Sequence, residues 1–166
     1  SVLVNNQNVG VLKGGALPYL RRNLGIIFQD HKLLFDRSVF DNVLLPLQIC
    51  GFDHRESGKR VRAALDKVGL LGKENLGPLE LSTGEQQRVG IARAVVSKPP
   101  VLIADEPTGN LDPALALEIM YLFKRLNDVG VTVMVATHDV HLIEHFDLPR
   151  VVLENGRVPA TGAADG

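Results

Sequence analysis

Two adjacent acidic residues follow a short apolar segment in the second half of the chain. Residues 101–104 (VLIA) show no polar alternation, which predicts a strand that is covered on both faces in a parallel sheet. Asp105 and Glu106 come next, at the carboxyl end of that strand, where open α/β sheets bind their ligands. One carboxylate there can hold Mg2+, which prefers oxygen ligands, and the second can accept a proton from an attacking water. Taken alone, such a pair is more often a surface or helix-capping feature.

A hydroxyl-containing turn ahead of the preceding helix favours the chemical interpretation. Residues 82–84 (STG) stand directly before the polar residues 85–88 (EQQR), so we expect them at a helix N-terminus. Such an end carries about half a positive charge and unpaired N–H donors, and it therefore binds anions. An ordinary serine N-cap would explain the turn by itself. Because the turn lies one helix upstream of Asp105 and Glu106, we interpret it as a phosphate-binding element.

Five segments resemble the motifs of ATP-binding-cassette (ABC) ATPases, in the order in which that family has them. They are residues 28–30 (FQD, the Q-loop), 81–88 (LSTGEQQR, the signature motif), 101–106 (VLIADE, the Walker B strand), 109–112 (GNLD, the D-loop) and 137–139 (THD, the switch-histidine loop). Residues 28–31 (FQDH), 41–43 (DNV) and 84–94 (GEQQRVGIARA) are most similar to the cell-division branch of the family. Lipoprotein-export and macrolide-export ATPases remain alternatives.

The resemblance implies an α/β fold, namely a P-loop NTPase core with a parallel sheet plus a helical subdomain at about residues 36–80. We expect residues 1–166 to form one partial domain with a flexible tail at 159–166. No G-x-x-x-x-G-K-[ST] motif occurs in the chain, and residues 10–15 (GVLKGG) come closest to it. We therefore expect the N-terminal strand and the phosphate loop of the family to be lacking, as in a truncated cassette.

The resemblance also implies roles for individual residues in a head-to-tail homodimer that binds ATP and Mg2+. ATP would lie between the phosphate loop of one copy and the signature turn of the other. The implied residues are Glu106, His138 and Gln29 for catalysis; Ser82, Gly84, Gln86 and Asp112 for nucleotide binding and the link between the two sites; and Asp105 and Gln29 for Mg2+.

Two departures from the family pattern affect these expectations. Thr83 stands where the family usually has glycine, and a β-branched residue tolerates a positive φ poorly. We therefore expect a less open signature turn and a weakened contact. Without the phosphate loop, we expect the chain alone to bind ATP weakly and to be inactive as an ATPase.

Composition limits the other classes of function. The net charge is −1, from 18 basic and 19 acidic residues, which argues against a general nucleic-acid binder. No apolar run has the length needed to cross a bilayer. The resemblance implies an FtsX-like integral membrane partner, which would hold the chain on the cytoplasmic, inner face of the bacterial cell membrane. A non-catalytic half-cassette that docks on such a partner is a further alternative.

The periodicity of the sequence predicts the elements that position these residues. The expected helices span 16–22, 38–45, 55–68, 85–97 and 113–129; the expected strands span 24–28, 101–104 and 131–136; and hairpins are expected at 1–11 and at Asn155-Gly156. We expect the helix after Ser38 to end before Pro46. The apolar residues between 28 and 47 predict either a partner groove or a core between helices, with equal weight.

Overall fold

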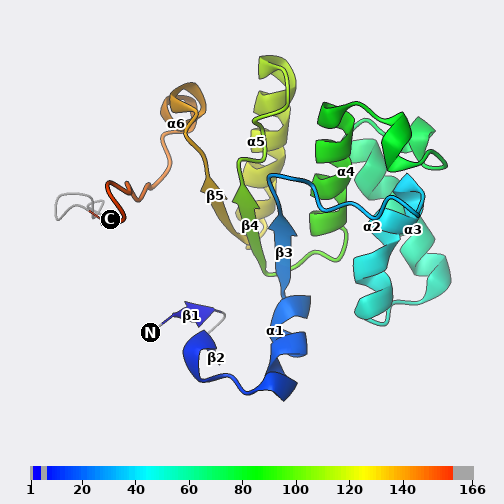
Figure 1. Ribbon diagram of the computed structural model, residues 1–166, viewed down its shortest axis with the longest axis horizontal. Coiled ribbons are helices and arrows are strands. Elements are labelled where there is room, and N and C mark those ends of the chain that lie inside the picture. Colours follow the sequence, from blue (N-terminus) through cyan, green and yellow to red (C-terminus); the bar gives the residue numbers. More distant parts are fainter. Residues whose placement is uncertain (1, 5–6, 159–166) are drawn as a thin grey trace.

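A three-stranded parallel sheet lies at the centre of the computed structural model, which describes residues 2–4 and 7–158 (Figure 1). Strands β3 (Leu24–Ile27), β4 (Val101–Asp105) and β5 (Thr132–Ala136) are arranged in the order β3-β4-β5. All pairs are parallel, so the three carboxyl ends lie at one edge of the sheet. The expected parallel α/β core is thereby confirmed. The expected flexible tail at 159–166 lies outside the described residues.

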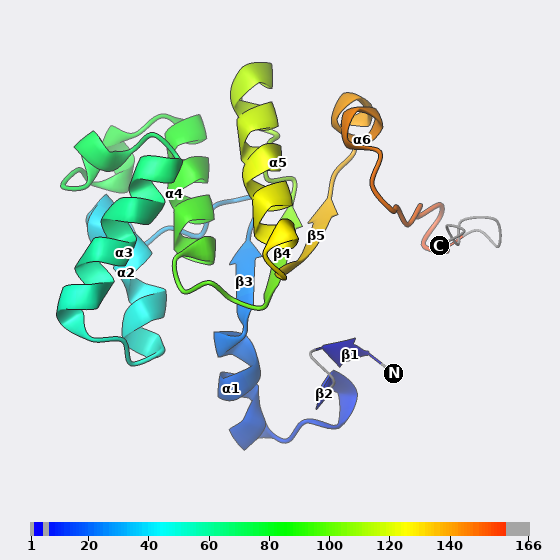
Figure 2. The same ribbon diagram turned by 180° about the vertical axis from the view of Figure 1, so that it is seen from behind.

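Helix α5 (Pro113–Asp128) connects β4 to β5 and lies on one face of the sheet (Figure 2). The Asp112 carboxylate accepts a hydrogen bond from the Leu115 N–H at 3.1 Å, and proline occupies the first turn, as expected of a helix start. Gly130 closes the connection with a φ of 94°, a conformation that few other residues adopt easily. The unit confirms the predicted strand–helix–strand arrangement.

Helices α2 (Val39–Ile49), α3 (His54–Lys67) and α4 (Thr83–Val95) pack together beside the sheet, on the β3 side (Figure 1). Two short 3-10 helices, Leu71–Lys73 and Pro78–Glu80, connect α3 to α4. The buried apolar side chains of these helices include Val39, Val43, Leu47, Val61, Leu65, Val89 and Ile91.

The expected end of the helix before Pro46 is wrong, because α2 continues through Pro46 to Ile49. A proline inside a helix costs about 3 kcal/mol. Full burial of a leucine contributes about 1.5–3 kcal/mol, and Leu44 and Leu47 on either side of Pro46 are both buried. Their burial offsets the cost of the proline and its missing hydrogen bond. The sequence pattern alone does not show which of the two free-energy contributions is larger.

The N-terminal segment lies below the sheet in Figure 1. It contains the antiparallel pair β1 (Leu3–Val4) and β2 (Gln7–Asn8), two 3-10 turns at Val9–Val11 and Gly14–Ala16, and helix α1 (Leu17–Arg22). At the other end of the chain, helix α6 (Val140–Phe146) follows β5. The predicted Asn155-Gly156 turn is confirmed, since Glu154 and Arg157 form a bridge and the two central residues have φ values of 50° and 75°.

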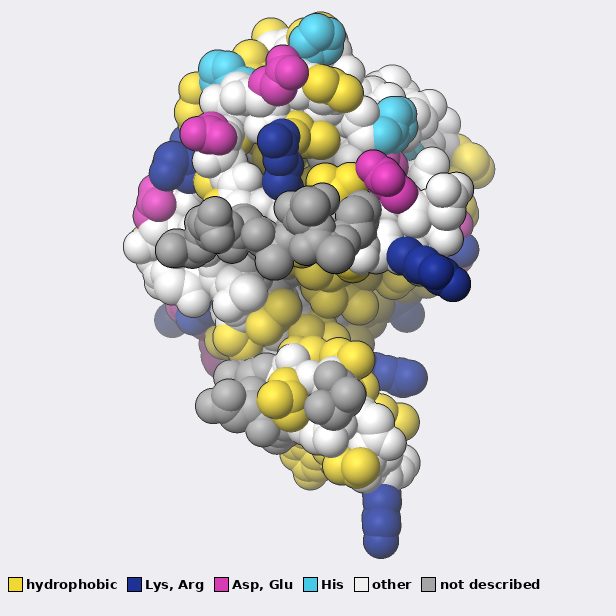
Figure 3. Space-filling view, turned by 90° about the vertical axis from the view of Figure 1, so that its left-hand side faces the viewer, with side chains coloured by type: hydrophobic (Ala, Val, Ile, Leu, Met, Phe, Trp, Pro, Cys, Tyr) yellow, Lys and Arg dark blue, Asp and Glu magenta, His cyan; other side chains and the backbone are white. Residues whose placement is uncertain are grey.

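The two faces of the sheet differ in coverage. Helix α5 lies over the face seen in Figure 2, and α4 packs against β3 beside it, where a Cβ atom on Gly25 would meet the Ala94 carbonyl. No described helix lies over the face seen in Figure 1. Apolar side chains are also visible on the side of the molecule towards α6 (Figure 3). None of the helices in the described part of the chain is long and apolar enough to cross a membrane.

Candidate functional site

The residues predicted to act on the phosphate lie where the parallel strands end. Asp105 is the last residue of β4, and Glu106 continues the ladder because its N–H donates to the Ala136 carbonyl at 2.9 Å. His138 follows β5 by two residues, and Gln29 follows β3 by two residues. Histidine and acidic side chains are visible together at the upper end of the molecule, which is the carboxyl end of the strands (Figure 3).

Glu106 and His138 are in direct contact at this edge. The Glu106 Oε1 atom lies 2.7 Å from His138 Nδ1 and accepts a second hydrogen bond from the His138 N–H at 3.0 Å. Thr137 donates its hydroxyl to the other carboxylate oxygen at 3.3 Å. Glu106 has a φ of 45°, an uncommon value for a non-glycine residue, and such residues cluster at functional sites. The structure therefore aims this carboxylate at the end of the neighbouring strand.

The carboxylate changes the acid–base behaviour of the histidine. The hydrogen bond that the Glu106 carboxylate accepts, together with the charge of that carboxylate, raises the pKa of His138 above its ordinary value. The imidazole itself is 90% exposed, so solvent screens the pair strongly. The remaining ring nitrogen, Nε2, is the atom with which His138 can contact a phosphate oxygen.

Asp105 and Gln29 are the residues expected to hold Mg2+. Both are exposed at the carboxyl edge of the sheet, and no described basic side chain forms an ion pair with Asp105. No group of three His, Cys, Asp or Glu side chains among residues 2–4 and 7–158 could hold a metal by itself. One free carboxylate fits Mg2+ bound together with nucleotide phosphates, because this ion keeps several waters and takes few protein ligands.

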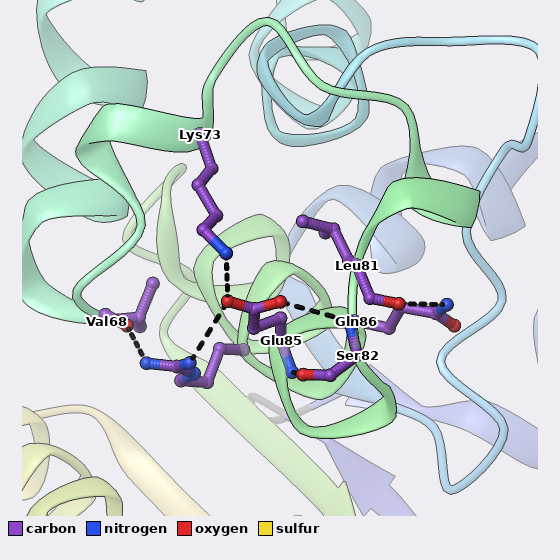
Figure 4. Close-up of polar contacts among 7 residues, drawn as sticks. Val68, Lys73, Leu81, Ser82, Glu85 and Gln86 are labelled. Atoms are coloured by element: carbon purple, nitrogen blue, oxygen red, sulfur yellow. Dashed lines mark hydrogen bonds and ion pairs between the residues drawn. The ribbon is translucent and has the colours of Figure 1, made fainter.

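The signature turn forms the N-terminus of α4. Ser82 is the N-cap: its Oγ accepts from the Glu85 N–H at 3.3 Å, and its own N–H donates to Glu85 Oε2 at 3.0 Å (Figure 4). Thr83 is the first residue of the helix and has no positive φ. The positive φ on which the expectation for Thr83 rested is absent, because this position has ordinary helical backbone that threonine adopts. A Cβ atom on Gly84 would lie 3.0 Å from the Asn110 carbonyl, so the turn packs closely against the D-loop segment.

A basic residue outside the motif also holds this turn. Lys73 Nζ lies 2.5 Å from Glu85 Oε1 (Figure 4). Arg88 Nη2 lies 4.0 Å from the same oxygen. The bond to Lys73, with the backbone bond to Ser82, lowers the pKa of Glu85 from 4.5 to about 2. No sequence pattern indicates this role for Lys73, because the residue lies 12 positions before Glu85, at the end of the short 3-10 helix between α3 and α4.

Gln86 and Asp112, the other predicted nucleotide contacts, have local partners. The Gln86 amide donates to the carbonyls of Pro78 at 3.0 Å and Leu81 at 3.3 Å, which leaves only its oxygen for a ligand. Asp112 caps α5 and remains exposed. Thr137, to which sequence reasoning assigned no separate role, is the additional site residue, since its hydroxyl orients Glu106.

A groove of about 500 Å3 lies between α1, β3, α2 and α4. Its apolar lining includes Phe28, Leu34 and Ile49. The charged residues that line it are all basic: Arg21, Arg22, Lys32 and Arg93. The core interpretation of the apolar segment 28–47 is confirmed for Leu33 and Val39, which are buried, while Phe28 and Leu34 line the groove. A partner in that groove stays a prediction.

Comparisons with known proteins agree with this arrangement of motifs. The chain is 57% identical to the cell division ATP-binding protein FtsE of Escherichia coli (strain K12) over 147 residues, which cover 89% of this chain and 66% of that protein. It is 49% identical to FtsE of Haemophilus influenzae over 92% of this chain and 70% of that protein. The chain thus spans about two thirds of the length of these relatives.

Solved structures show the same fold. The ATP-binding cassette MJ0796, in a dimeric post-hydrolysis state bound to ADP and Pi, superposes with a TM-score of 0.87 at 35% identity. That superposition covers 95% of this chain and 70% of the cassette. The profile of the ABC transporter family matches residues 1–109. The chain therefore belongs to the ABC transporter family, as one of its ATP-binding cassettes.

Proposed function

We propose that this chain is the nucleotide-hydrolysing part of an ABC-type complex that acts in bacterial cell division, splitting ATP with water into ADP and phosphate. The observation that carries the proposal is the pairing of Glu106 with His138 at the joined ends of β4 and β5. A carboxylate held at the ligand-binding edge of a parallel sheet is well placed to act on a water near bound phosphate.

Each residue of the carboxyl edge has a defined task in this scheme. Glu106 accepts a proton from the attacking water, and Gln29 orients that water. His138 contacts the γ-phosphate through Nε2, since Nδ1 is engaged with Glu106. Asp105 is the ligand for Mg2+, which when bound neutralises charge on the phosphates. The protein therefore contributes positioning and charge stabilisation, which is what phosphoryl transfer requires.

A second copy of the cassette completes the site. The Ser82 Oγ atom accepts a hydrogen bond from within α4, so its hydroxyl hydrogen is free to donate to the γ-phosphate bound by the other copy. Gly84 allows the backbone of the turn to approach the phosphate, and the helix N-terminus adds a favourable dipole. The dimeric arrangement of MJ0796, at 35% identity, supports a head-to-tail dimer here.

The membrane partner is the remaining component. We propose that an FtsX-like integral membrane protein holds the cassette at the inner face of the cell membrane, with the helical subdomain at about 36–80 contributing the contact surface. The groove between β3 and α2 supports this, because its apolar lining and all-basic charge suit a partner helix with acidic side chains. Co-purification with an FtsX-like protein, rather than with a lipoprotein or macrolide exporter, tests the assignment.

The test of catalysis is Glu106→Gln in a cassette that carries a phosphate loop ahead of these residues and is assembled with its membrane partner. We expect kcat for ATP to fall by about 100- to 10,000-fold, the usual contribution of a general base. Glu118→Gln is the matched control, because this exposed glutamate lies on α5, has no assigned part in the site and should leave kcat unchanged. A kcat for the Glu106 variant within about twofold of the control would rule out the proposed role.

The isolated 166-residue chain is expected to behave differently. It contains no G-x-x-x-x-G-K-[ST] sequence, whose backbone N–H groups and lysine cradle the phosphates in P-loop proteins. We therefore expect weak ATP binding by the chain alone, and micromolar affinity in calorimetry would contradict this.

A further inference from the structure

The loop that follows Gln29 contains two consecutive residues in the left-handed backbone region. His31 has a φ of 60° and Lys32 has a φ of 48°. Neither residue is glycine, and left-handed backbone is unfavourable for such residues unless the surrounding structure holds it. Strained positions of this kind concentrate at functional sites.

One guanidinium group holds both residues of this turn. Arg93 on α4 donates from Nη2 to the His31 carbonyl at 2.6 Å and from Nη1 to the Lys32 carbonyl at 2.7 Å. The planar fork of arginine suits two adjacent acceptors, and charged hydrogen bonds are stronger than neutral ones. The turn is thereby fastened to a helix that lies more than 60 positions away in the sequence.

The next part of the loop is fastened to a different helix. Asn42 on α2 is fully buried, accepts from the Leu34 N–H at 2.8 Å and donates to the Leu34 carbonyl at 2.9 Å. The strained turn therefore lies between two points of the loop. Gln29 is exposed at the sheet edge, and the backbone of Leu34 is held by Asn42. On α4, the Gln87 side chain also lies beside the buried His31 side chain, while Arg93 bonds the backbone carbonyls of the turn.

Arg93 also faces the groove. Arg93 and Lys32 both line it, together with Phe28 directly before Gln29. The helix that carries Arg93 begins at the signature turn, with Ser82 as its N-cap. A molecule in the groove would therefore lie against the same contact that joins the Gln29 loop to the signature helix.

We propose that Arg93 is a positioning residue, which keeps the 31–32 turn left-handed and so holds Gln29 in place. Through the same contact, Arg93 couples that loop to the helix that begins at Ser82 and to the groove. The inference rests on the proposed function for the roles of Gln29 and Ser82. Arg93 does not contact the reacting atoms, and it acts through the backbone of the loop.

Amide hydrogen exchange on the 166-residue chain tests whether Arg93 holds the turn. The His31 N–H bonds to the Phe28 carbonyl at 3.1 Å and the Leu34 N–H bonds to Asn42, so both amides report on the loop. In Arg93→Met we expect their exchange to accelerate by about tenfold or more, which is the effect of releasing one strained residue. Amides inside α3 should keep their rates.

Arg88→Met is the matched control, because Arg88 lies on the same helix and donates to a carbonyl elsewhere, that of Val68 at 3.1 Å. It should leave the exchange of His31 and Leu34 unchanged. Equal rates in Arg93→Met and the unaltered chain would overturn the proposal, and so would an acceleration spread evenly over α3 and the loop.

A rescue experiment separates this role from general support of the fold. Glycine adopts positive φ readily, so Lys32→Gly removes part of the strain that Arg93 opposes. We expect Arg93→Met to accelerate loop exchange by about threefold or less in the Lys32→Gly background, compared with about tenfold in the original chain. An unchanged tenfold effect in that background would contradict the proposal.

ATP turnover by a cassette that also carries a phosphate loop, assembled with its membrane partner, provides the functional measurement. Arg93→Met should lower kcat by about fivefold or more and keep KM within about twofold, because Gln29 acts on the attacking water rather than on ATP binding. A raised KM with an unchanged kcat would overturn the positioning role. Absence of turnover in the unaltered complex would instead contradict the proposed function, and the exchange measurements, which need no nucleotide, would still decide whether Arg93 holds the turn.

Discussion

The two faces of the central sheet are unequally covered, although both are apolar. On the face under α4 and α5, Leu102 and Ala104 are completely buried. On the other face, Ile26, Ile103 and Met134 lie side by side in register, and Met134 is 60% exposed. A parallel sheet normally has both faces covered. In this chain the helix-covered face must therefore supply most of the stability of the sheet, while the open face and the strand ends stay accessible to other molecules.

The largest expected difference between the faces comes from truncating one large apolar side chain on each. Leu102→Ala should lower the free energy of unfolding by about 3 kcal/mol, because it leaves a cavity under the helices. Met134→Ala should change it by about 0.5 kcal/mol or less, because that side chain is already mostly in water. Chemical denaturation of both variants measures the difference. Equal effects would show that the second face is covered in solution.

Close packing on the covered face gives the next effect. A Cβ atom on Gly25 would lie 2.5 Å from the Ala94 carbonyl and 2.9 Å from Leu102 Cδ1. Gly25→Ala should therefore destabilise the chain by about 1–3 kcal/mol, as overpacked sites do. Gly72→Ala is the control, because a Cβ atom there would meet nothing within 4 Å. If the two alanine variants unfold at the same denaturant concentration, β3 and α4 are less tightly packed than the structure indicates.

Two local features of the fold could be predicted from the sequence. The spacing of Val61, Ala64 and Leu65 indicates the buried stripe of α3, and all three are buried. Asn155-Gly156 indicates its turn because few dipeptides fit two positive φ values. Short-range patterns of this kind depend on neighbouring residues only.

Features that depend on distant residues could not be predicted in the same way. The path of α2 through Pro46 depends on what Leu47 packs against. The pairing of Lys73 with Glu85 depends on how the segment between α3 and α4 folds back. The motifs indicated that Glu106 and His138 belong to one site. They could not indicate that Glu106 takes a left-handed conformation to reach His138.

Two carboxylates extend the comparison from apolar to charged side chains. Glu85, among the packed helices, has its pKa lowered to about 2, chiefly by Lys73. A lowered pKa stabilises the folded chain above the ordinary value of 4.5, and this contribution is lost as the pH falls from 4.5 towards 2. In Lys73→Met the pKa of Glu85 should return towards 4.5, as measured by carbon NMR of the carboxyl group. Stability at neutral pH should fall by about 1 kcal/mol or less, because Lys73 is partly exposed.

Lys67→Met controls for the loss of one positive charge, since Lys67 is exposed at the end of α3. It should leave the Glu85 titration unchanged. If Lys73→Met also left that titration unchanged, the signature turn would be held by its capping box alone.

The smallest expected effect belongs to the open edge, where Glu106 meets His138. The hydrogen bond and charge of Glu106 raise the pKa of His138, so the ion pair is present at low pH and weakens as the pH rises through the raised value. Glu106→Gln should shift the imidazole titration down towards 6.5, as followed by NMR of the ring nitrogens. The stability of the chain should hardly change, because the imidazole is largely in water.

Glu118→Gln is the control and should leave the His138 titration unchanged. An unshifted titration in Glu106→Gln would mean that the two side chains do not meet in solution. Glu85 would then be held by its partners far more firmly than Glu106 is held by His138, and the contrast between the two carboxylates would be larger than the structure implies.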